Sequence, residues 1–137
     1  MFRDYQDSHE DYLKAIYLIS KKSRGGWVSN SKIANFLNVK PPSVTNMLHK
    51  LKSEGYVAWT PRKAIRLTNK GKTVAKNIVR YNLKLKDFFK NILNIKDELI
   101  LEELCCKIEH HITPEIITTL ENLDLNSEYI SKNWKHC

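Results

Sequence analysis

The segment from Ser29 to Gly55 constrains the fold more than any other part of the chain. It holds two short helical patterns with a tight break between them, over residues 38–40. Apolar side chains recur in both patterns at spacings that place them on one face of a helix. They are Ile33, Ala34 and Leu37 in the first pattern, and Val44, Met47, Leu48 and Leu51 in the second. Two short amphipathic helices joined in this way predict a helix-turn-helix.

The other face of the second predicted helix is polar. Its members are Ser43, Thr45, Asn46, His49 and Lys50. Short polar side chains on an exposed helix can read base edges in the major groove of DNA. Pro41 and Pro42 favour the start of this helix, because proline lacks an N–H that the first turn would leave unpaired, and Gly55 favours its end. An ordinary helical hairpin with a solvated polar face is the alternative for this segment alone.

The distribution of charge favours DNA. The chain has 137 residues and a formal net charge of +8. Residues 21–90 contain 17 Lys and Arg against two acidic residues, whereas residues 91–137 contain four Lys against nine acidic residues. The positive field therefore covers the predicted helix-turn-helix and its flanks, where phosphates would lie. An anionic membrane surface would need an accompanying helix rich in Trp and Phe, and the sequence does not show one.

Two short segments after the helix-turn-helix, residues 56–60 and 64–68, alternate apolar and polar residues around Pro61, Arg62 and Lys63. This pattern predicts a β-hairpin, and a hairpin directly behind a recognition helix makes a winged helix. A basic solvated turn is the alternative. We expect Thr45 and Asn46 to meet base edges and the basic residues to contact phosphates. The full set of expected DNA contacts is Pro42, Ser43, Thr45, Asn46, Lys50, Arg62 and Lys63.

Helices are predicted on both sides of this unit. Ser8 is a candidate N-cap for a first helix that ends near Ser20, and Thr68 is one for a long helix. Apolar residues of the long helix alternate at steps of four and three, which is a heptad seam. A second subunit or the following helices could cover this seam, and we favour a homodimer, because dimers read two half-sites one DNA turn apart. The expected interface residues are Val74, Ile78, Tyr81, Leu85 and Phe88.

A further helix is expected to begin at Asp97, with Leu101, Leu104, Cys105, Ile108 and Ile112 on its apolar side. Another side carries Glu102, Cys106, Glu109 and His110, within an arc of about 100° at 3.6 residues per turn. Thiolate, carboxylate and imidazole groups are ligands of transition metals. An ordinary surface helix, or a structural or redox-responsive Cys/His face, is the alternative.

These patterns predict a mainly α fold, in which a winged helix-turn-helix (residues 1–70) precedes an all-helical dimerisation and metal-binding region (71–125) and a polar tail (126–137). No apolar run is long enough for a membrane span and the start of the chain is charged, so we expect a cytoplasmic protein without a membrane partner. Three cysteines, two of them adjacent, make a poor disulfide framework. The sequence shows neither a nucleophile–base arrangement nor a phosphate-binding glycine loop, so we expect no enzyme.

Four motifs occur in a characteristic order: HEDYLKAIY at 9–17, VKPPSVTNML at 39–48, LTNKG at 67–71 and CCKIEHH at 105–111. Together they resemble the metal-dependent repressor family, whose members include the diphtheria toxin repressor and the manganese transport regulator. The resemblance extends to about Leu123, and the layout is similar to the short members without an SH3-like domain. It implies a homodimeric transcriptional repressor of metal-homeostasis genes that binds a double-stranded operator when Fe²⁺ or Mn²⁺ is plentiful.

The resemblance also implies a set of metal ligands. The family pattern falls on Asp11 in the first helix and on Cys106, Glu109 and His110 in the fifth. Asn82 and Glu102 are positions that could complete the shell. A thiolate ligand at Cys106 would shift the preference from Mn²⁺ toward Fe²⁺, Co²⁺ or Zn²⁺.

Three positions depart from the family pattern. A carboxylate expected one turn after Asp11 is Lys14, a histidine expected on the long helix is Asn82, and an acidic position there is Lys86. These departures argue against a full two-metal site. They leave room for one metal ion per chain, which we expect, or for a winged-helix transcription regulator that does not sense metal.

Overall fold

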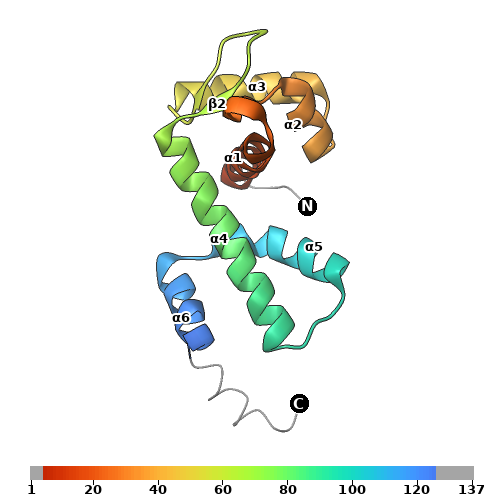
Figure 1. Ribbon diagram of the computed structural model, residues 1–137, viewed down its shortest axis with the longest axis vertical. Helices are drawn as coiled ribbons and strands as arrows, with labels where there is room; N and C mark the ends of the chain where they lie inside the picture. Colours follow the sequence, from red (N-terminus) through yellow and green to blue (C-terminus); the bar gives the residue numbers. More distant parts are fainter. Residues whose placement is uncertain (1–4, 126–137) are drawn as a thin grey trace. The chain divides into compact units, whose positions relative to one another are not determined.

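The computed structural model describes residues 5–125, which form six α-helices, two short 3₁₀-helices and a two-stranded sheet (Figure 1). The chain divides into two compact units, Met1–Ile78 and Val79–Cys137, and the boundary falls inside the long helix α4 (Asn69–Asn91). The polar tail that the sequence predicts over 126–137 lies outside the described residues. None of the helices described is long and apolar enough to cross a membrane.

The first unit is a winged helix. Its elements are α1 (Tyr5–Lys22), η1 (Arg24–Gly26), α2 (Asn30–Leu37), α3 (Pro41–Ser53), β1 (Val57–Ala58), β2 (Arg66–Leu67) and the start of α4. β1 and β2 pair antiparallel with Val57 opposite Leu67, and Val28 forms a separate bridge to Ile65. The helix-turn-helix and the wing that the sequence predicts are both confirmed.

Local signals set the bounds of α2 and α3. The Ser29 hydroxyl accepts a hydrogen bond from the Lys32 backbone N–H (3.3 Å) and caps α2. Asn38 ends this helix with φ 53°, a left-handed conformation that asparagine tolerates better than most residues. Pro41 occupies the first position of α3, and Gly55, with φ 81°, follows its C-terminal end.

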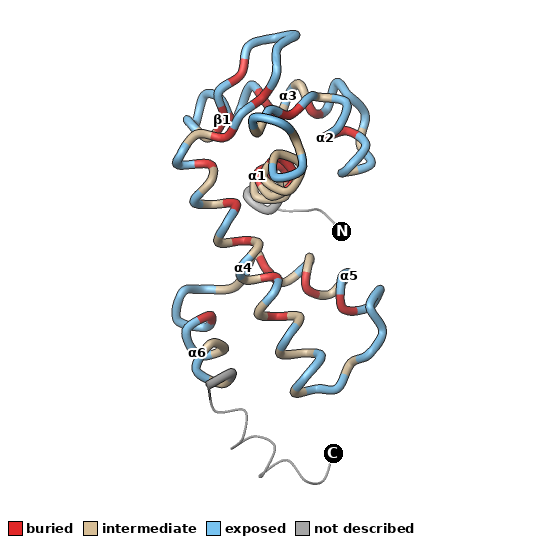
Figure 2. The backbone as a smooth tube through the Cα atoms, in the orientation of Figure 1, coloured by how far each residue is buried: buried red, intermediate tan, exposed pale blue. Residues whose placement is uncertain are grey.

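The core of the first unit is made by the predicted apolar faces. Val44, Leu48 and Leu51 of α3 have no exposed surface, and Ile33 of α2 is buried with them. The buried positions of α1 and α3 are visible in Figure 2. Burying a side chain of this size contributes about 1.5–3 kcal/mol, so this face fixes how α3 sits in its unit. Leu37 and Met47 are only partly buried at the edge of the core.

The start of α1 differs from the prediction. The helix begins at Tyr5, so Ser8 lies inside it and is not its N-cap. Residues 5–7 contain neither glycine nor proline, and nothing in the local sequence forces the helix to start later.

Thr68 caps α4 as predicted and also ties it to the turn after α3. Its hydroxyl accepts a hydrogen bond from the Gly71 N–H (3.2 Å) and donates one to the Gly55 carbonyl oxygen (2.6 Å). A Cβ at Gly71 would collide with the backbone carbonyl of Tyr56. The glycine of the LTNKG motif therefore permits a close approach between α4 and the backbone before β1.

The second unit contains the rest of α4, α5 (Glu98–Ile108), η2 (Glu109–His111) and α6 (Pro114–Leu125). The Asp97 carboxylate accepts hydrogen bonds from the N–H groups of Leu99 (2.9 Å) and Ile100 (3.1 Å), which confirms the predicted helix start. The α-helix was expected to reach Ile112 but ends at Ile108. Residues 109–111 continue as the 3₁₀ turn η2, and Pro114 is the first residue of α6.

Part of the predicted heptad seam of α4 is already buried by other residues of the same chain. Ile78 and Leu85 are buried, whereas Val74, Tyr81 and Phe88 are half-buried. The large exposed apolar side chains described in the second unit lie elsewhere. They are Leu83, Leu93, Leu99, Ile100 and Ile116. The assignment of the seam to a dimer interface stays a prediction.

Candidate metal centre

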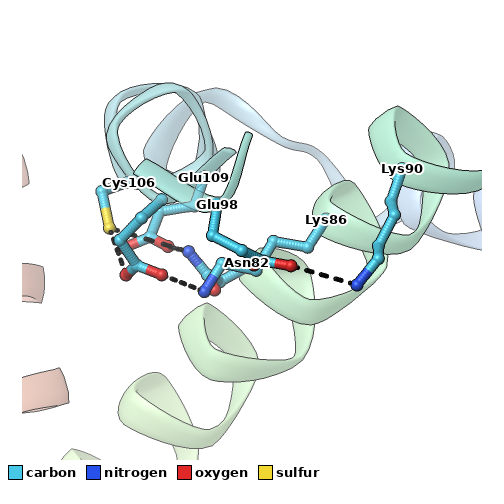
Figure 3. Close-up of polar contacts among 7 residues, drawn as sticks. Asn82, Lys86, Lys90, Glu98, Cys106 and Glu109 are labelled. Carbon is cyan, nitrogen blue, oxygen red and sulfur yellow. Dashed lines mark hydrogen bonds and ion pairs between the residues drawn. The ribbon is translucent and has the colours of Figure 1, made fainter. Parts of the chain in front are cut away.

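Asn82 of α4 links two of the predicted metal ligands of the second unit, Cys106 and Glu109 (Figure 3). Its side chain is buried, with 6% of its surface exposed. The amide nitrogen donates a hydrogen bond to Oε2 of Glu109 (2.7 Å) and a longer one to Sγ of Cys106 (3.8 Å). The amide nitrogen is a donor and not a metal ligand, so through this atom Asn82 orients two candidate ligands, while its oxygen is the atom that could complete a metal shell.

Glu109 and His110 bring a carboxylate and an imidazole together out of contact with water. Glu109 is fully buried, and its Oε1 lies 3.7 Å from Nε2 of His110. Two ligand atoms held about 2.1 Å from one tetrahedral ion are about 3.4 Å apart, which is close to this separation. A buried carboxylate is costly unless positive charge and hydrogen bonds compensate it. A divalent cation would supply that charge.

Cys106 and Cys105 differ in environment although they are adjacent. Cys106 is half-buried, and its thiol donates a hydrogen bond to Oε1 of Glu102 (3.3 Å). Cys105 is fully buried, as its place on the apolar side of the predicted helix requires. Burial raises the pKa of the Cys105 thiol to about 11, although the nearby Lys86 ammonium acts to lower it. Since metals bind the thiolate, Cys106 is the candidate ligand of the pair.

The donor set fits a transition metal. Thiol, carboxylate and imidazole groups come from the five-residue stretch 106–110, and together they suit Fe²⁺, Co²⁺ or Zn²⁺. The structure brings Cys106, Glu109 and Asn82 into one hydrogen-bonded group, and His110 lies beside Glu109. Asp11 is half-buried on α1, in the other unit. Its participation therefore stays a prediction.

Glu102 has a role that the sequence does not reveal. The Lys86 ammonium forms an ion pair with its Oε2, and the Cys106 thiol contacts its Oε1. Lys86 was identified only as a departure from the family pattern. The signal that could have found the pair is the matched four-residue spacing of Lys86 and Lys90 on α4 and of Glu98 and Glu102 on α5.

The expected DNA contacts lie mostly on exposed surface of the first unit. Those on α3 are Pro42, Ser43, Asn46 and Lys50, and those at the wing turn are Arg62 and Lys63. Arg62 has φ 66°, so the tip of the wing is a tight turn. All six side chains are placed where phosphates or bases could reach them, and their contacts with DNA stay predictions.

Thr45 differs from the other residues of this set. It is half-buried, and its hydroxyl donates a hydrogen bond to the Pro41 carbonyl (3.3 Å) while it accepts one from the Asn30 side chain (3.0 Å). The hydroxyl therefore fixes α2 against α3, and the methyl group is the part of Thr45 left for a base. Asn30 was missed from the sequence, because the contact joins residues 15 positions apart.

Two family models match consecutive parts of the chain. The iron dependent repressor N-terminal DNA binding domain matches residues 4–65, and the iron dependent repressor metal binding and dimerisation domain matches residues 68–126. The chain belongs to the iron-dependent repressor family. This is a family of transcriptional repressors and not of enzymes, as the sequence predicts.

The chain is also similar to individual regulators. It is 40% identical to an uncharacterised HTH-type transcriptional regulator of Methanocaldococcus jannaschii, over 83% of this chain and 90% of that protein. It is 35% identical to the HTH-type transcriptional regulator MntR of Shouchella clausii, over 85% of this chain and 78% of that protein. The solved structure of the manganese regulator SloR matches with a TM-score of 0.70 and 32% identity. That match covers 86% of this chain and 53% of SloR, so the chain spans about half of that structure.

The different burial of the Cys105 and Cys106 thiols predicts a difference in their reactivity. In a Cys137→Ser background, iodoacetamide should modify Cys106 at pH 7–8 and leave Cys105 unmodified, as read by peptide mass spectrometry of the folded protein. Because the Cys105 pKa is raised, its thiol stays protonated at neutral pH and should gain reactivity only as the pH approaches about 11. Equal modification of both thiols at pH 7 would contradict this assignment.

Proposed function

We propose that this protein is a metal-responsive, DNA-binding transcriptional repressor of metal-homeostasis genes that acts as a homodimer. The observation that carries the proposal is the buried Glu109 carboxylate, held by Asn82 beside His110 and Cys106. Membership of a family whose two domains bind DNA and metal supports it.

Cys106, Glu109 and His110 would hold the metal ion, and the family pattern adds Asp11. A bound divalent ion supplies the positive charge that a thiolate and buried carboxylate need. Asn82 keeps the Glu109 carboxylate oriented through its Oε2 atom. Glu102 lies beside Cys106 and supports the thiol. Fe²⁺ and Mn²⁺ are the expected physiological ions, and Co²⁺ and Zn²⁺ suit the same donors in vitro.

The metal response requires the ion to favour one arrangement of the protein over another. Asp11 belongs to the winged-helix unit and the other ligands to the helical unit. An ion that takes ligands from both units would restrict their relative movement and favour the arrangement that fits DNA. The effect on DNA affinity can be no larger than the difference in metal affinity between the arrangements.

DNA reading is assigned to α3 and the wing. Ser43, Asn46 and the methyl group of Thr45 would meet base edges in the major groove, with Pro42 at the start of the helix. Lys50, Arg62 and Lys63 would contact phosphates. Two such units in a dimer would read half-sites about one helical turn apart.

A dimer needs an apolar contact surface. The described second unit exposes Leu83, Leu99 and Ile100, and Leu99 keeps 83% of its surface exposed. Tyr81 and Phe88 of the predicted seam are half-buried and can contribute, whereas Leu85 is already buried by its own chain. We therefore place the interface on this set of side chains.

Metal should strengthen DNA binding. In a fluorescence anisotropy titration of operator DNA, Fe²⁺, Mn²⁺, Co²⁺ or Zn²⁺ should lower the Kd by about tenfold or more, a typical size for coupling between two sites. His110→Ala should abolish the response because it removes a ligand. The neighbouring, exposed His111 offers a matched control, since His111→Ala should keep the response. If the metal-free protein binds DNA as tightly as the metal-loaded one, the protein is a winged-helix regulator that does not sense metal.

The wing should add phosphate contacts. Arg62→Ala and Lys63→Ala should each weaken binding about equally on all DNA sequences and flatten the slope of log K against log salt by about one unit. Lys107→Ala removes the same charge from the helical unit, at a residue outside the predicted set of DNA contacts, and should leave the slope unchanged. Unchanged slopes in both wing variants would remove the wing from the interface.

Exposed apolar residues should hold the dimer together. The double variant Leu99→Glu/Ile100→Glu should yield folded monomers. In the isolated chain both carboxylates are exposed to water and leave the fold intact, whereas a dimer would have to bury them in its interface. Leu85→Glu should unfold the helical unit by burying an unpaired charge. Sedimentation velocity with circular dichroism separates these outcomes. A stable dimer in the double variant, together with a folded monomer in Phe88→Asp, would assign the interface to the seam alone.

A further inference from the structure

Two ion pairs join α4 to α5 in the same register (Figure 3). Lys86 pairs with Glu102, and one turn further along α4 Lys90 pairs with Glu98 (3.1 Å). The lysines are four residues apart, and so are the glutamates. The two pairs have the same chemistry but different neighbours, which makes them a natural comparison.

Only the first pair touches the candidate metal ligands. Glu102 accepts from the Lys86 ammonium through Oε2 and from the Cys106 thiol through Oε1. Cys106 in turn lies 3.8 Å from the Asn82 amide, which holds Glu109. A continuous set of polar contacts therefore runs from Lys86 to the buried carboxylate.

Lys86 is also less exposed than its counterpart. Its side chain keeps 27% of its surface exposed, against 55% for Lys90. Charges in a partly buried setting are screened less by water and salt than charges on the open surface. The Lys86 ammonium therefore acts on the cluster more strongly than an ordinary surface lysine would.

An ammonium group has donors and no lone pair, so it occupies a carboxylate without being able to ligate a metal. We propose that Lys86 is a resident cation of this cluster, which neutralises Glu102 and limits the helical unit to one divalent metal ion. A second ion at Glu102 would have to approach a fixed positive charge and compete with it for the same carboxylate. Glu102 is then a positioning residue for Cys106. The proposal rests on the proposed metal binding at Cys106, Glu109 and His110.

Metal stoichiometry tests this role directly. The full chain is dialysed against Co²⁺, and bound metal is counted by inductively coupled plasma mass spectrometry. The wild-type protein should hold one ion per chain. Lys86→Glu replaces the resident cation with a carboxylate beside Glu102 and should raise the count to about two. Lys90→Glu makes the same change one turn away from the cluster and should leave the count at one.

A second variant keeps the test informative if Lys86→Glu does not fold, as judged by circular dichroism. Lys86→Gln removes the charge and adds no carboxylate, so it should still hold one ion and bind it several-fold more tightly in a Co²⁺ titration. Lys90→Gln should bind Co²⁺ with wild-type affinity. The Co²⁺ absorption spectrum reports whether the thiolate remains a ligand of the first ion.

The outcomes separate the two proposals. A wild-type protein that holds two ions would overturn the role of Lys86, as would a folded Lys86→Glu that holds one ion. Equal Co²⁺ affinities of the wild type and Lys86→Gln would also overturn it. A wild-type protein that binds no metal would instead overturn the proposed function on which this role rests.

Discussion

The buried carboxylate of Glu109 is the constraint on which the functional region of the helical unit depends. A carboxylate without exposed surface needs hydrogen bonds and positive charge, because its desolvation would otherwise cost several kcal/mol. The Asn82 amide supplies a hydrogen bond of 2.7 Å from the neighbouring helix, and the His110 imidazole lies close to the other oxygen. The position of α4 beside α5 is thereby coupled to the geometry of the candidate ligands.

Features set by local sequence could be predicted well. The apolar spacing of Val44, Leu48 and Leu51 is decisive because one face of a short helix must be buried, and the structure buries all three. The caps at Asp97 and Thr68 depend on residues only two or three positions away, and both are present. The candidate ligands could be identified by type and by the family resemblance. The predicted N-cap at Ser8 is wrong, because a residue that can cap a helix indicates where a helix can start and not where it must start.

Contacts between distant residues are the part of the structure that the sequence analysis does not predict. The pairs Asn30–Thr45, Lys86–Glu102 and Asn82–Glu109 join side chains 15 to 27 positions apart. Their formation depends on how helices pack, which hydrophobic spacing alone does not fix. The same limit applies to Leu85, since periodicity identifies an apolar seam but not whether the same chain or a second one covers it.

The proposed function requires metal binding in the helical unit and DNA binding by the winged helix to be energetically coupled. Linkage makes this coupling reciprocal, so DNA must change the metal affinity by the same factor by which metal changes the DNA affinity. The most direct test is a Co²⁺ titration of the protein, followed by its absorption spectrum, with and without saturating operator DNA. We expect saturating DNA to lower the Kd for Co²⁺ by about tenfold or more. Identical Co²⁺ affinities in the presence and absence of DNA would contradict it.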